Sequence, residues 1–171
     1  MNLRAICFRE TDKIKPLDEI LIWSHYADKH RGVRIGFEFP DGMKDPFKVA
    51  KITYQEKRVE IDLSITKSIE IGGGELMRSL ETKSKAWEYE HEFRLFTTKA
   101  KCKKQKMPDS TTEFFLEFKK EWVKSVDFGV RCPLDDVERI IGVLKTSYSK
   151  DIICRKANYH ESEYALKYDT I

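Results

Sequence analysis

Apolar and polar residues alternate over several short stretches of this chain, which predicts a protein rich in β-strands. The clearest case is residues 33–39, where Val33, Ile35 and Phe37 alternate with polar residues or glycine, the period of a half-buried strand. Similar runs predict further strands at 3–8, 47–54, 92–98, 112–118, 123–128, 139–144 and 164–168.

Helical signals are fewer. Pro16 suits a first turn, and the acidic residues at 18 and 19 suit the positive end of a helix dipole. His30 and Arg31 before Gly32 suit a last turn and a stop, so we predict a helix from about residue 16 to 31. Shorter helices are predicted at 75–87, 133–138 and 149–158.

The predicted strands outnumber the helices and do not alternate with them regularly. We therefore expect an α+β fold with a mainly antiparallel sheet and helices packed on it. The 171 residues suit a single domain spanning residues 1–171. The side chains expected to be largely buried are Trp23, Phe37, Phe93, Leu95, Ile140 and Ile141.

Composition narrows the function classes only slightly. The 32 Lys and Arg nearly balance the 29 Asp and Glu, so the net charge of +3 gives no argument for nucleic acid or a membrane surface. No apolar run approaches the about 20 residues that span a bilayer, and we expect a cytoplasmic protein. The four cysteines form no C-x-x-C pair, so we expect free thiols and no metal site.

His25 is the first candidate for chemistry. Helical spacing places it beside Leu21, at the edge of a face formed by Leu17, Ile20, Leu21, Ser24 and Ala27. A histidine at the border of a buried face can exchange a proton near neutral pH. It can also be a satisfied structural residue, which is the more frequent outcome.

The second set of candidates lies between residues 83 and 96. On the predicted second helix, Lys83 falls within the apolar stripe, where a lysine either snorkels to the surface or has a buried anionic partner; snorkelling is the expected outcome. In the strand that follows, a period of two places Glu90, Glu92 and Arg94 on one face. Such a face is either a solvated ion pair or the floor of a polar pocket.

Two sequence motifs carry a family resemblance. Trp-Ser-His-Tyr-Ala stands at 23–27, followed by His-Arg-Gly at 30–32. Trp-Glu-Tyr-Glu-His-Glu-Phe-Arg-Leu stands at 87–95, after Lys83. With Cys-Phe at 7–8, these motifs resemble a widespread bacterial family of unknown function, the domain family numbered 2971.

The resemblance implies a set of functional residues. Its polar signature falls on His25, Lys83 and Glu92, which we assign as catalytic candidates, and on His30, Glu90 and Arg94, which we assign to substrate binding. Members usually carry a segment before the Cys-Phe strand, with an Asn-Asp-Pro-Phe motif. We therefore expect a protein partner or second chain that supplies such a segment.

Three functions remain open. Glu-x-Glu at the start of a strand resembles the catalytic motif of ADP-ribosyltransferases, which implies a nucleotide substrate such as NAD and a defence- or toxin-type enzyme. The second hypothesis is a binding module or partner subunit without catalysis. The third is nucleic-acid binding through a basic loop at 99–106, which is less favoured because binders usually show a wider basic face.

Overall fold

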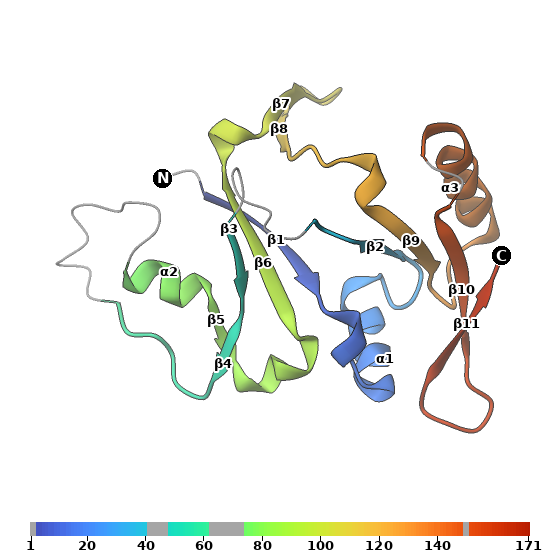
Figure 1. Cartoon of the computed structure of the whole chain (residues 1–171), viewed down its shortest axis with the longest axis horizontal. Coiled ribbons are helices and arrows are strands. Elements are labelled where there is room, and N and C mark those ends of the chain that lie inside the picture. The colour runs from blue at the N-terminus through green and yellow to red at the C-terminus, as the bar shows by residue number, and fades with distance from the viewer. Residues whose placement is uncertain (1–2, 41–47, 62–73, 149–150) are drawn as a thin grey trace. The chain divides into compact units, whose positions relative to one another are not determined.

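The computed structural model describes residues 3–40, 48–61, 74–148 and 151–171 (Figure 1). The chain forms two compact units, each built from two separate segments. Unit 1 combines Met1–Ile14 with Met43–Glu117, and unit 2 combines Lys15–Gly42 with Phe118–Ile171.

Unit 1 is organised around a three-stranded antiparallel sheet. Its central strand is β6 (Glu92–Thr98), which lies between β1 (Leu3–Arg9) and β3 (Lys48–Lys51). Two short strands, β4 (Thr53–Gln55) and β5 (Thr82–Ser84), pair in parallel. The other elements are α2 (Glu75–Leu80), the antiparallel pair β7 (Lys103–Lys106) and β8 (Thr112–Phe115), and the 3-10 helices η1 (Thr11–Lys13), η2 (Lys85–Glu90) and η3 (Lys99–Lys101).

Unit 2 contains a four-stranded mixed sheet. The strand order is β11 (Leu166–Thr170), β10 (Ile153–Tyr159), β9 (Val123–Phe128) and β2 (Val33–Phe37). Only the β9–β10 pair of this sheet is parallel. The helices are α1 (Pro16–Tyr26), α3 (Leu134–Ser147) and the 3-10 turn η4 (Lys120–Trp122).

The core of unit 2 lies between β9 and α3. Val126 and Phe128 from the strand pack with Cys132 and Val137, and all four are buried. Ile140, Ile141 and Leu144 continue the same helix face at spacings of three and four residues, and they pack against this cluster.

The α+β class and the mainly antiparallel pairing are confirmed. Several predicted elements are wrong. Residues 139–144 lie in α3 and not in a strand, because a short apolar run fits a buried strand and a helix face equally well. Residues 153–158, predicted helical, belong to β10, where they pair with both neighbouring strands.

Both predicted helices of the motif regions are shorter than expected. The first ends at Tyr26, because Asp28, Lys29 and His30 all have positive φ values of 44° to 68° and form a left-handed turn. The second ends at Leu80, and Lys83 lies in β5. The predicted basic loop at 99–106 contains strand β7.

The burial predictions are confirmed for Trp23 and Leu95, whereas the other four side chains are only half-buried. The predicted apolar face of the first helix is wrong, because Leu17 and Leu21 are 57% and 40% exposed while Trp23 is buried. All four cysteines are free thiols. Within the described ranges, every helix is too short or too polar to cross a bilayer.

Candidate functional site

Lys83 stands at the centre of a charged cluster in unit 1. Its Nζ donates to Glu90 Oε2 at 2.5 Å and to Glu92 Oε2 at 3.1 Å. The side chains of Glu90 and Glu92 are 0% and 2% exposed. The expectation that Lys83 snorkels is therefore wrong, and the alternative of a buried anionic partner holds for two carboxylates at once.

Two arginines complete the cluster. Arg94 Nε donates to Glu92 Oε1 at 2.7 Å, and its Nη1 donates to the Leu80 carbonyl oxygen. Arg9 Nη2 lies 3.5 Å from Glu90 Oε1. The side chains of Arg9, Lys83 and Arg94 are 17%, 21% and 19% exposed. Three partly exposed cations thus accompany two buried carboxylates, which leaves this five-residue cluster with a formal charge of +1.

The backbone explains how these side chains meet. Arg9 lies opposite Glu92 across the β1–β6 pair, and the period of two places Glu92 and Arg94 on one face of β6. Glu90 belongs to η2 instead, and His91, with φ of 45°, makes the turn between the two glutamates. Spacing and sequence motifs predict one polar cluster of His25, Lys83, Glu92 and Arg94. The structure brings Lys83, Glu92 and Arg94 together in unit 1, with Glu90 beside them.

The contacts within the cluster keep Glu92 and Lys83 in their charged forms. Burial alone would raise the pKa of Glu92, but hydrogen bonds from Arg94, Cys7 and Lys83 outweigh burial and lower this pKa to about 2. Burial would lower the pKa of Lys83, yet its hydrogen bonds to the two glutamates raise this pKa. Glu92 is thus an anion and Lys83 a cation throughout the physiological pH range.

This electrostatic state limits the chemistry of Glu92. An effective general base has a pKa near the working pH, and both Glu92 oxygens already accept hydrogen bonds from Arg94 or Lys83. The arrangement suits a fixed negative charge that orients cations. The exposed parts of Lys83 and Arg94 suit an anionic ligand, for which guanidinium and ammonium groups are the usual partners.

The two histidines of the motif lie in unit 2. His25 is exposed, and its ring makes an edge-to-face contact with Tyr26 at 6.4 Å between centroids. The proximity of His25 to Lys83, Glu92 and Arg94, which lie in unit 1, remains a prediction.

His30 is buried within unit 2, and its imidazole has one defined hydrogen bond. Ser24 Oγ donates to the Ile20 carbonyl oxygen, so His30 Nε2, 2.9 Å from that hydroxyl oxygen, is the donor between them. Its ring stacks on Trp23 with an interplanar angle of 13°. Burial and the nearby Arg131 charge lower the pKa of His30. These contacts describe a neutral imidazole packed into the turn after α1.

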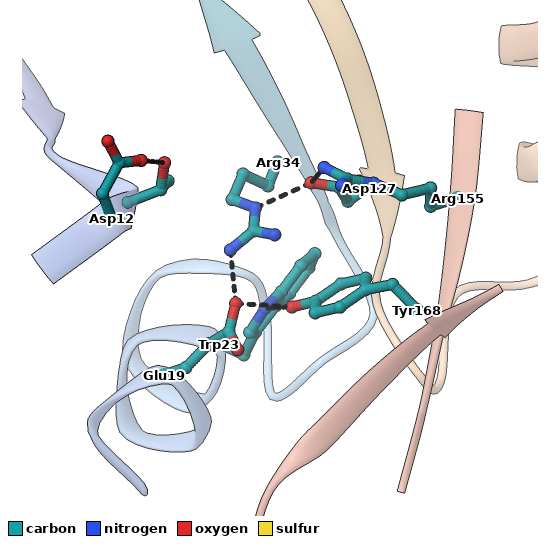
Figure 2. Close-up of polar contacts among 8 residues, drawn as sticks. Asp12, Glu19, Trp23, Arg34, Asp127, Arg155 and Tyr168 are labelled. Atoms are coloured by element: carbon teal, nitrogen blue, oxygen red, sulfur yellow. Dashed lines mark hydrogen bonds and ion pairs between the residues drawn. The ribbon is translucent and has the colours of Figure 1, made fainter. Parts of the chain in front are cut away.

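Unit 2 also holds a charge network that the sequence did not suggest. Asp127, only 1% exposed, accepts hydrogen bonds from Arg34 Nε at 2.8 Å and from Arg155 Nε at 2.6 Å (Figure 2). Arg34 Nη1 also donates to Glu19 Oε1 at 2.5 Å. The network ties α1 to strands β2, β9 and β10.

Tyr168 extends this network toward Trp23. Its hydroxyl donates to Glu19 Oε1 at 2.7 Å and accepts from Trp23 Nε1 at 2.9 Å, as Figure 2 shows. The Arg34 guanidinium lies 4.9 Å from the centre of the Tyr168 ring. Each of these side chains has a hydrogen-bond partner on another element, which is typical of a structural network.

Sequence reasoning missed Arg9, Tyr54 and Cys7 in unit 1. The Tyr54 hydroxyl accepts a hydrogen bond from the Glu92 backbone N–H at 2.8 Å. Arg9 follows the Cys-Phe pair of the resemblance, and its place directly after a predicted strand is the available signal. In unit 2 the signal was Asp127 itself, a charged residue next to Val126 and Phe128.

Comparison with known proteins gives one match. The family described as Protein of unknown function (DUF2971) matches residues 22–95, which agrees with the resemblance seen in the two motifs. The matched range contains the histidine motif, Lys83 and the Glu-x-Glu strand. No curated protein and no solved structure matches the chain.

Proposed function

We propose that unit 1 binds a phosphorylated small molecule of the nucleotide class. The matching family has no described activity, so the proposal is argued from the charged cluster. The binding groups are the partly exposed ends of Lys83 and Arg94. One observation carries the proposal: two buried carboxylates hold these cations in place while about a fifth of each cationic side chain stays exposed.

The buried carboxylates give the cations a fixed direction. Bonds from Lys83 to both glutamates, and from Arg94 to Glu92 and the Leu80 carbonyl, restrict both side chains before any ligand arrives. Such preorganisation reduces the entropy lost on binding. Arg9 adds positive charge beside Glu90. Glu90 and Glu92 are in this proposal positioning residues.

The binding proposal is tested by calorimetric titration with NAD, ADP-ribose, AMP and inorganic phosphate as separate probes. The test variant combines Lys83→Met with Glu90→Gln, which removes one charge of each sign and avoids an unpaired buried carboxylate. We expect at least a tenfold weaker affinity in this variant. The matched control is Lys85→Gln. Lys85 is exposed and lies two residues after Lys83 in the sequence, so this variant should bind the probes with the parent affinity.

Two results would overturn the proposal. One is a parent protein that binds none of the four probes. The other is a double variant that melts at the parent temperature and binds with the parent affinity. If the double variant shows no thermal transition, it is unfolded and Arg94→Lys replaces it as the test variant. This substitution keeps the positive charge but removes the planar guanidinium group, and it should weaken phosphate binding severalfold.

Transfer of ADP-ribose from NAD is the narrower proposal for the same site: the bond between nicotinamide and the ribose breaks, nicotinamide leaves, and a nucleophile of an acceptor molecule in the extract bonds to the ribose carbon. A carboxylate that stays ionised suits the stabilisation of positive charge developing on a ribose carbon. The free protein holds both cations against the carboxylates. Because Glu92 is 2% exposed, contact with a sugar requires Lys83 and Arg94 to shift onto the ligand phosphates after the ligand has bound. Consumption of NAD in cell extract, lost in Glu92→Gln, supports transfer; binding without consumption rejects transfer and keeps the binding site.

A further inference from the structure

The β7–β8 pair divides its side chains between two faces. Residues directly opposite each other in an antiparallel pair lie on the same face. Lys104 lies opposite Phe114 and Lys106 opposite Thr112, and these four residues share one face. Lys103 lies opposite Phe115 on the other face. Figure 1 shows the pair beyond the end of β6.

Charge is segregated between these faces. Lys103 Nζ lies 3.1 Å from Glu117 Oε1, and Gln105 lies opposite Glu113 on the same face. The opposite face carries Lys104 and Lys106, and Lys99 joins it with its ammonium group 4.0 Å from the centre of the Phe114 ring. We call Lys99, Lys104 and Lys106 the lysine face.

The lysine face contains no acidic side chain that would neutralise its lysines: the residues of β7 and β8 on this face are Lys104, Lys106, Thr112 and Phe114. Within the described part of the chain, no carboxylate pairs with Lys104 or Lys106, and both side chains are exposed. Asp109, three residues after Lys106, accepts from Thr111 N at 3.0 Å and from Thr111 Oγ1 at 2.6 Å, so its carboxylate closes the turn. Neighbouring like charges on one strand face repel each other, and a polyanion would relieve this repulsion.

We infer that the lysine face binds the phosphate backbone of duplex DNA. The major groove of B-form DNA admits a two-stranded β-ribbon, and lysines that alternate along such a ribbon can reach separate phosphates. The major groove of A-form RNA is too deep and narrow for this approach. The face presents Thr112 and Phe114 besides lysines, and ammonium contacts to phosphates carry no sequence information, so binding is independent of sequence.

The number of lysines fixes the expected salt dependence. Neutralisation of three phosphates gives a slope of about −2.7 for the logarithm of the association constant against the logarithm of salt concentration. The affinity should therefore fall about 40-fold between 50 and 200 mM salt.

The experiment measures fluorescence anisotropy of a labelled random-sequence 20-base-pair DNA duplex with the full chain. The test variant is Lys104→Gln with Lys106→Gln. The control is Lys103→Gln with Lys167→Gln, which removes the same charge from lysines that are paired with Glu117 and Glu161. We expect at least tenfold weaker binding and a slope reduced by about 2 for the test variant, and near-parent values for the control.

Several outcomes would overturn the inference. Equal losses in both variants would show an effect of net charge alone. Stronger binding of single-stranded DNA or duplex RNA would reject the groove geometry, and binding of polyglutamate as tight as that of DNA would indicate an acidic protein as the partner. No binding of DNA at 50 mM salt would reject the surface. Circular dichroism confirms that each variant is folded.

Discussion

At the scale of single residues, the described part of the chain contains three buried carboxylates, Glu90, Glu92 and Asp127. Each lies against two cationic side chains: Lys83 and Arg9, Lys83 and Arg94, and Arg34 and Arg155, respectively. A buried charge is tolerated only with such compensation. Changes to one partner are therefore expected to cost more than changes to an exposed ion pair.

The low pKa of Glu92 predicts an acid-sensitive contribution to stability. Its folded pKa of about 2 lies below the ordinary value of 4.5, so the contribution is complete above pH 4.5 and is lost as the pH falls toward 2. The shift corresponds to about 3 kcal/mol. Urea unfolding of the parent at several pH values should show this loss, and Glu92→Gln should show a flatter profile.

The matched control for the acid series is Glu117→Gln, whose side chain is 73% exposed. It should retain the full acid dependence of the parent. An unchanged pH profile in Glu92→Gln would show that Glu92 is not held as an anion by its neighbours.

The hydroxyl of Tyr168 gives a prediction for unit 2. Tyr168→Phe leaves Trp23 Nε1 and Glu19 Oε1 without this partner, and an unsatisfied buried group costs about 1–3 kcal/mol. The free energy of unfolding, followed by tryptophan fluorescence, should fall by this amount. Tyr164→Phe is the control because Tyr164 is 87% exposed, and it should change stability little.

The periodicity of the sequence predicts the position of some residues of the charged cluster and not of others. The period of two on a seven-residue strand correctly placed Glu92 and Arg94 on one face. Helical spacing predicts Lys83 on a helix stripe, yet it lies in a three-residue strand whose pairing with β4 no local pattern reveals. Tyr54 and Arg9 reach the cluster through long-range pairing, which a single sequence does not encode in its periodicity.

At the scale of elements, the turn between α1 and β2 is a constrained connection within unit 2. Three successive non-glycine residues, Asp28 to His30, have positive φ, a conformation that costs free energy for each. The His30 carbonyl oxygen accepts from Arg131 N at 2.9 Å, and Gly129 N donates to Gly32 O at 3.0 Å. These bonds to the loop after β9 hold the turn in place.

Gly129 is the position where this turn is most sensitive. A Cβ at Gly129 would lie 2.2 Å from the His30 carbonyl oxygen and 3.0 Å from the Trp23 ring. Gly129→Ala should therefore lower the free energy of unfolding by about 1–3 kcal/mol or more, measured by urea denaturation.

Gly142→Ala provides the opposite expectation. A Cβ there meets nothing within 4 Å, and the residue lies inside α3. Alanine should stabilise the helix by about 0.5–1 kcal/mol. Equal effects of the two substitutions would contradict the close approach at Gly129.

At the scale of the whole molecule, the class was predictable and the arrangement was not. Strand-rich alternation gave the α+β class, because side-chain periodicity is local. The partners of each strand depend on contacts far apart in sequence, such as Leu3 with Thr98 or Val33 with Phe128. The expectation of a single domain was drawn from length alone, and length carries no information about which segments pack together.

The interleaving of the two units constrains how the chain can fold during synthesis. The chain enters unit 2 at Lys15, leaves it after Gly42, completes unit 1 by Glu117 and only then returns. Strand β2 pairs with β9, which is synthesised about ninety residues later. The strand partner of β2 is therefore still missing when the last residue of unit 1 has been synthesised. Unit 1 can fold first on the ribosome, carrying the first part of unit 2 as an open loop between its own two segments. The histidine motif is therefore among the early parts of the chain to be made and among the last to reach its final environment.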